Sequence, residues 1–163
     1  FWKVAEDTQL LYKNTKNDTS CLSIINDEYF CTGSINSSID LWTFKKKKPV
    51  SRVKDVHPYN NAKSPHKYSW ITGLSSIRNS DLVCSAGIDS TVNFYKFMKD
   101  EKKLELIGIL PDAASGGFVK GVVNTIKFSP KRNFVAFSHS DEERLGRWFV
   151  SKPEKLGLSI VKL

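Results

Sequence analysis

The sequence predicts an all-β fold that is a fragment of a β-propeller, and three observations carry this prediction. A strand-like segment ends in an aromatic residue four times, at Trp2, Trp42, Tyr95 and Trp148. These residues lie 40, 53 and 53 residues apart, which is near the period of propeller blades. Short apolar segments alternate with turn residues throughout, and no long amphipathic helix pattern interrupts them.

The predicted strands group into blades of four. Residues 1–13 supply the end of one blade, and complete blades are expected at 19–53, 69–110 and 121–163, about three and a half in all. Turn residues such as Gly, Pro, Asn, Asp and Ser separate the strands. The strands of the complete blades are expected, in order, at 20–25, 29–34, 38–44 and 49–53, then at 70–77, 82–87, 90–97 and 103–110, then at 121–128, 134–140, 144–150 and 156–163.

The number of blades is too small for a closed ring, which needs about four to eight. We therefore expect the chain either to be a piece of a longer protein or to associate with a second copy through its open blade edges. The aromatic strand ends are expected to be blade-packing residues, because their period is that of the blades.

The residues that could support catalysis show no catalytic pattern. Neither the three histidines (His57, His66 and His139) nor the three cysteines (Cys21, Cys31 and Cys84) have the spacing of metal ligands. There is no nucleophile elbow and no phosphate-binding glycine loop. We expect no enzyme, metal, cofactor or small-molecule substrate. No apolar stretch is long enough for a transmembrane helix, so we expect no membrane partner.

The net charge of +8 comes almost entirely from residues 45–67, which hold eight basic residues and one acidic residue. Basic side chains contact phosphates, and the interleaved His and Tyr side chains can stack on bases. This segment therefore predicts contact with nucleic acid or with an acidic protein, the alternative being an ordinary solvated loop. The candidate contact residues are Lys45, Lys46, Lys47, Lys48, Arg52, Lys54, His57, Lys63 and Lys67.

Arg144 and Arg147 form a second candidate site. Their odd spacing in a strand directs them to opposite sides of the sheet. One could pair with the acidic run at 141–143, while the other could reach a partner. Structural ion pairing remains the alternative.

The chain resembles the C-terminal half of the WD-repeat proteins of the U3 small nucleolar ribonucleoprotein. The resemblance rests on residues 41–50, 70–87 and 121–129, and above all on the RLGRWF motif at 144–149 with the closing strand at 159–163.

This resemblance implies a seven-bladed ring, residence in the nucleus and nucleolus, and a non-catalytic role in pre-rRNA processing for small-subunit ribosome biogenesis. It implies U3 RNA and the core proteins of the particle as partners. The alternative function is a protein-only scaffold that binds an acidic peptide.

The chain departs from the WD-repeat pattern at several positions. The expected Gly-His pairs are missing, Tyr95 replaces the usual Trp, and Asn36 replaces an Asp. We therefore expect the Asp-His-Ser/Thr-Trp hydrogen-bond network of these repeats to be weakened.

Overall fold

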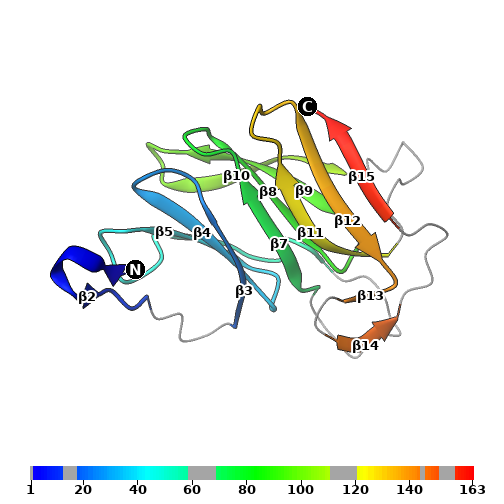
Figure 1. Cartoon of the computed structure of the whole chain (residues 1–163), viewed down its shortest axis with the longest axis horizontal. Helices are drawn as coiled ribbons and strands as arrows, with labels where there is room; N and C mark the ends of the chain where they lie inside the picture. Colours follow the sequence, from blue (N-terminus) through cyan, green and yellow to red (C-terminus); the bar gives the residue numbers. More distant parts are fainter. Residues whose placement is uncertain (1, 13–17, 59–68, 111–120, 144–145, 151–156) are drawn as a thin grey trace.

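The computed structural model describes residues 2–12, 18–58, 69–110, 121–143, 146–150 and 157–163, with the backbone alone for 142–143 and 146–150 (Figure 1). These residues form antiparallel β-sheets, with one short 3-10 helix, η1 (Val4–Glu6). The predicted all-β class is confirmed. Near the N-terminus, β1 (Trp2–Lys3) and β2 (Thr8–Gln9) form a separate two-stranded ribbon around η1.

Two four-stranded sheets form where the sequence predicts them. Each strand pairs with its neighbour in the chain, and each begins and ends within two residues of the predicted range. The first sheet contains β3 (Thr19–Ile24), β4 (Tyr29–Ser34), β5 (Ile39–Thr43) and β6 (Ser51–Val53). The second contains β7 (Ile71–Ser76), β8 (Leu82–Gly87), β9 (Val92–Met98) and β10 (Lys103–Leu110).

The third sheet differs from the prediction. It contains β11 (Val122–Phe128), β12 (Phe134–Ser140) and β15 (Gly157–Lys162), in that order. The prediction that residues 144–150 form its third strand was wrong, because β14 (Gly146–Val150) pairs with β13 (Glu142–Glu143) in a separate hairpin. The place beside β12 goes to β15, where Val161 lies opposite Val135 and packs against the adjacent core.

The same correction changes the role of the aromatic strand ends. Trp42 and Tyr95 are each only 2% exposed and lie opposite equivalent residues of β4 and β8, so their packing role is confirmed. Val161 holds the corresponding position in the third sheet. Trp2 is 56% exposed, and Trp148 belongs to the β13–β14 hairpin, so neither closes an equivalent strand.

The inner strands β3, β7 and β11 lie side by side and hold the three sheets together (Figure 1). Each has a β-bulge after its first residue or two, and in β3 and β7 the side chain of the bulged residue bonds to the next inner strand. Ser20 Oγ donates to the carbonyl of Ile71 at 2.5 Å, and Thr72 Oγ1 donates to the carbonyl of Val123. The second sheet therefore stacks on the third in the same way as the first sheet stacks on the second.

Apolar side chains fill the spaces between the stacked sheets. One core, which includes Leu41 and Ile71, lies between the first and second sheets, and another, which includes Val92 and Val135, lies between the second and third. Gly33 is required at the first contact, because a Cβ there would lie 2.8 Å from Ile71 Cγ2. Leu22 in the first sheet and Leu158 in the third, the two end sheets of the stack, remain exposed.

The buried cysteines give a prediction about alkaline stability. Burial raises the pKa of the Cys31 thiol to about 12, and burial also raises the pKa of Cys84. The unfolded thiols ionise near their ordinary pKa of 9.0, so these groups stabilise the fold below that pH, and the stabilisation is lost as the pH rises from about 9 to about 12.

We expect the urea midpoint of the full-length protein to fall between about pH 8 and pH 10 more steeply than that of a C31A/C84A variant. Equal slopes for the two proteins would contradict this account. Thiol labelling below pH 9 should reach Cys31 only after unfolding.

Candidate functional site

The stacking of the sheets creates two edges with different side chains. The β3–β4, β7–β8 and β11–β12 turns lie at the same end, because the inner strands run in parallel across the stack. The β5–β6 and β9–β10 turns join them there, since Phe44 N donates to Glu28 O at 3.1 Å and Phe97 N donates to Asp81 O at 2.6 Å. We call this end the turn edge: residues 25–28, 44–50, 77–81, 99–102 and 129–133.

The opposite end is the loop edge. Its described residues are 35–38, 54–58, 69–70, 88–91, 121 and 141. Antiparallel pairing of β6 with β5 carries the chain from one edge to the other, because Ser51 lies opposite Leu41 and Val53 opposite Ile39. The basic segment predicted from the sequence is therefore divided between two edges.

The lysine run, Lys45–Lys48, lies on the turn edge. It leaves β5 in a turn in which Lys46 N donates to Thr43 O at 3.2 Å, and all four lysines are exposed. Lys45 Nζ forms an ion pair with Glu28 at 2.8 Å. This hydrogen bond raises the pKa of Lys45 and lowers that of Glu28. The lysine run thus presents a concentrated positive charge to solvent.

Arg52 has a structural role. Its guanidinium forms an ion pair with Asp40, which is fully buried and lies opposite Arg52 in the β5–β6 register. The second contact joins Nη2 to Oδ2 at 2.8 Å, and the hydrogen bond to Asp40 raises the pKa of Arg52. The pair neutralises a buried carboxylate, so Arg52 is held against the sheet rather than presented to a partner.

Lys54 is not brought together with the lysine run, because it lies at the opposite edge, where it is exposed. Lys63, Lys67 and Arg144 lie outside the described residues, and Arg147 is described by its backbone alone.

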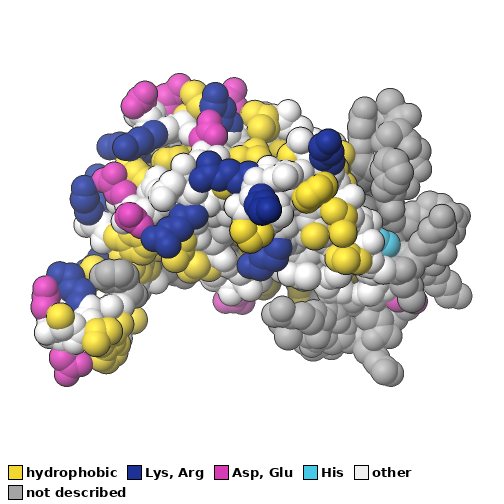
Figure 2. Space-filling view, turned by 45° about the horizontal axis from the view of Figure 1, so that its top comes forward, with side chains coloured by type: hydrophobic (Ala, Val, Ile, Leu, Met, Phe, Trp, Pro, Cys, Tyr) yellow, Lys and Arg dark blue, Asp and Glu magenta, His cyan; other side chains and the backbone are white. Residues whose placement is uncertain are grey.

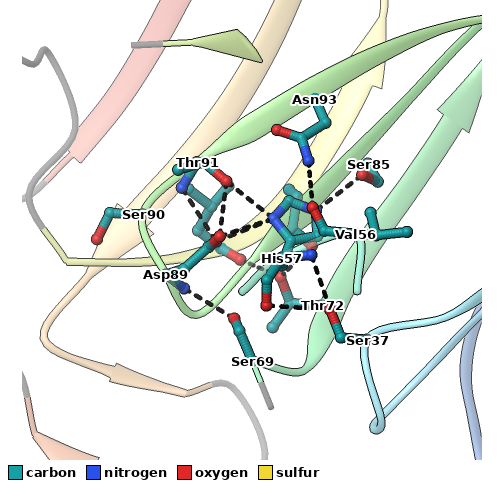
Figure 3. Close-up of polar contacts among 12 residues, drawn as sticks. Ser37, Val56, His57, Ser69, Thr72, Ser85, Asp89, Ser90, Thr91 and Asn93 are labelled. Atoms are coloured by element: carbon teal, nitrogen blue, oxygen red, sulfur yellow. Dashed lines mark hydrogen bonds and ion pairs between the residues drawn. The ribbon is translucent and has the colours of Figure 1, made fainter. Parts of the chain in front are cut away.

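His57 was wrongly predicted to be a surface contact, because it is 0% exposed and lies at the centre of a hydrogen-bond network (Figure 3). Its Nδ1 lies 2.9 Å from Asp89 Oδ1 and 2.8 Å from Thr91 Oγ1, and its Nε2 lies 2.8 Å from Ser85 Oγ. Its backbone N–H donates to Ser37 Oγ at 2.7 Å. The residue therefore ties the first sheet to the second.

The expectation of a weakened network was also wrong for the second sheet. Tyr95 takes the place of the usual Trp and forms a hydrogen bond with Ser85. Burial raises the pKa of the Tyr95 hydroxyl, and the hydrogen bond with Ser85 offsets part of this increase. In the first sheet the corresponding pair is Trp42 Nε1 donating to Thr32 Oγ1 at 2.9 Å. The sequence signal was the spacing of His57 from Ser85 and Asp89, which the position of His57 within a basic segment obscured.

Gly87 makes room for this histidine. A Cβ at Gly87 would lie 2.8 Å from His57 Cγ and 2.8 Å from Asp89 Oδ1, so only glycine fits there. A histidine between a carboxylate and a serine has the composition of a catalytic triad. Here Ser85 is 0% exposed, so no substrate reaches its hydroxyl, and the network stabilises the fold.

Other site types find no support in the part of the chain that is described. Its His, Cys, Asp and Glu side chains form no group of three that could hold a metal ion. Within the same residues, no helix has the length and apolar character needed to cross a membrane.

Stacked antiparallel sheets, joined by an Asp-His-Ser network at the loop edge, define a segment of a WD-repeat β-propeller. Solved structures agree: the chain superimposes on the "Crystal structure of RRP9 WD40 repeats" with a TM-score of 0.87 and 26% identity, over 99% of this chain and 47% of that one. "Structure of U3-55K" gives the same values. No family model matches the chain.

Curated sequences confirm the resemblance to WD-repeat proteins of the U3 particle. The chain is 26% identical over 157 residues to U3 small nucleolar RNA-interacting protein 2 of Homo sapiens, covering 96% of this chain and 32% of that protein. It is 26% identical over 151 residues to Ribosomal RNA-processing protein 9 of Saccharomyces cerevisiae, covering 80% and 26%. The chain thus spans a third or less of the length of these relatives.

Replacement of His57 by Ala should destabilise the fold. The change leaves Asp89 and Ser85 without their histidine partner in a buried setting, which should cost about 2–4 kcal/mol in the free energy of unfolding. Urea unfolding of the full-length protein measures this cost, with K54A as an exposed control from the same edge. If H57A unfolds like the wild type and instead loses RNA affinity, His57 acts at the surface after all.

Proposed function

We propose that this chain is part of a non-catalytic WD-repeat component of the U3 small nucleolar ribonucleoprotein. It acts in pre-rRNA processing for small-subunit ribosome biogenesis, in the nucleolus. The blade units 19–53, 69–110 and 121–163 form part of its ring. U3 RNA and the core proteins of the particle are its partners.

One observation carries the proposal. Sequence similarity and structural similarity lead to the same group of proteins, and the sequence alignment with the human relative runs along 96% of this chain. A likeness limited to the propeller fold would match WD-repeat proteins of many functions. Here the names of the human and yeast relatives refer to U3 RNA and to ribosomal RNA processing.

The lysine run supports a direct contact with RNA. Lysine ammonium groups attract phosphates without reading base sequence, so they supply affinity and orientation rather than specificity. Lys46–Lys48 are exposed, and no ion pair involves them within the described residues. Lys54, Lys63, Lys67, Arg144 and Arg147 remain candidate contacts.

Recovery of U3 RNA from cells tests the proposal. The full-length protein carries an affinity tag, and U3 RNA is measured in the purified fraction against an abundant unrelated RNA. We expect strong enrichment of U3 RNA and of core proteins of the particle. Equal recovery of both RNAs would contradict the proposal, and selective recovery of acidic proteins without RNA would favour a protein-only scaffold.

Neutralising the lysine run should weaken U3 binding without unfolding the protein. In a K46Q/K47Q/K48Q variant, the slope of log affinity against log salt should fall in magnitude by about three units, one for each lost phosphate contact. Fluorescence anisotropy with U3 RNA measures the slope.

The matched control is K46R/K47R/K48R, which keeps the charge and should keep the slope. If the Gln and Arg variants bind alike, the run contributes solubility only.

A further inference from the structure

Among the described residues, charge is unevenly divided between the two edges. The turn edge holds nine basic and five acidic side chains, whereas the described loop edge holds one basic and three acidic side chains. Figure 2 brings the turn edge toward the viewer and shows Lys and Arg side chains spread along it. The basic residues are Lys45, Lys46, Lys47, Lys48, Arg78, Lys99, Lys102, Lys131 and Arg132.

Most acidic side chains of the turn edge are already neutralised. Asp27 pairs with Arg78 at 2.9 Å, Glu28 with Lys45 at 2.8 Å, Asp81 with Lys96 at 3.9 Å, and Glu101 with Lys103. These exposed pairs remove acidic charge from the edge but add little stability. Seven basic residues have no ion pair within the described residues: Lys46, Lys47, Lys48, Lys99, Lys102, Lys131 and Arg132.

These seven residues extend across all three sheets. Lys46–Lys48 belong to the first sheet, Lys99 and Lys102 to the second, and Lys131 and Arg132 to the third. Backbone contacts keep neighbouring turns close: Asn79 N donates to Ile25 O at 2.9 Å, and Arg132 Nη2 donates to Arg78 O at 3.3 Å. The positive charge therefore follows the edge from sheet to sheet instead of filling one pocket.

The turn edge offers no aromatic surface for base stacking. Phe44 is its one aromatic residue, and this ring is half-buried against Phe30 with centroids 5.0 Å apart. Single-stranded RNA is usually held by stacking on aromatic side chains, whereas an RNA helix is recognised through its phosphates and shape. Beside the edge, Phe134 at the start of β12 is 41% exposed. One ring next to a row of seven cations fits an RNA helix better than a stacked single strand.

We propose that the turn edge binds the phosphate backbone of a double-stranded RNA segment. The contact begins at Lys46–Lys48 on the first sheet. It continues on the second sheet at Lys99 and Lys102 and on the third at Lys131 and Arg132. This inference rests on the proposed function. It adds the form of RNA and four contact residues that the sequence pattern did not identify.

The experiment measures binding of the full-length protein to three probes: a blunt RNA duplex of mixed sequence, one of its single strands, and polyglutamate. Two variants each remove two cations from one turn, K99Q/K102Q and K131Q/R132Q. The control, K3Q, removes one exposed lysine that lies outside the turn edge and outside the candidate contacts. All four substituted turn side chains are exposed, and unchanged thermal midpoints verify folding.

We expect the duplex to bind more tightly than the single strand. Each turn variant should lower the salt slope for the duplex by about two units, and the control should leave it unchanged. If both turn variants behave like the control, the inference is overturned. Preference for the single strand, or polyglutamate binding with the same sensitivity to the turn variants, would overturn it as well.

Its failure is distinguishable from failure of the proposed function. Enrichment of U3 RNA from cells by both turn variants at the wild-type level would overturn the turn-edge assignment and leave the proposed function standing. Loss of U3 enrichment by the wild-type protein would overturn the proposed function whatever the duplex measurements show.

Discussion

The stacking of the inner strands is the constraint on which the rest of the structure depends. β3, β7 and β11 lie side by side but belong to different sheets, so no backbone ladder fixes their relative position. Side-chain hydrogen bonds fix the relative position of these strands instead. Ser23 Oγ lies 2.8 Å from Ser76 Oγ, and Phe128 N donates to Ser75 Oγ at 3.1 Å, so small hydroxyl side chains set the alignment at both contacts between sheets. These buried and half-buried hydroxyls find partners only when the strands lie in this register, which penalises a shift of one sheet past the next.

This register also separates two tasks. At the loop edge, His57 and Asp89 form hydrogen bonds with each other and with the sheets, so these polar groups stabilise the fold. At the turn edge, the connections are short and their long charged side chains extend into solvent. A rigid scaffold that fixes both edges can place charges from different sheets in one row without any long-range contact among those charges.

The fold was largely predictable because each strand carries its own local pattern. Apolar segments bounded by turn residues identified β4, β5, β8 and β12 closely. The third sheet could not be predicted, because 144–150 and 157–162 both have strand patterns, and the sequence alone cannot say which pairs with β12. His57 was misplaced for a related reason: its partners Ser85 and Asp89 lie about thirty residues away, and a charge count of neighbouring residues contains no information on such contacts.

The proposed contact with RNA accounts for a lysine run that the stability of the fold does not require. Neighbouring like charges repel. Of the four lysines, only Lys45 forms an ion pair with a carboxylate among the described residues. Packing does not require Lys46–Lys48, whose side chains are exposed, so uncharged polar residues would serve the turn equally well. In the proposed complex, the RNA phosphates would relieve this repulsion by supplying negative charge. The same reasoning applies to Lys131 and Arg132, adjacent in a turn of the third sheet, and it connects residues that are far apart in the sequence through one electrostatic property of the edge.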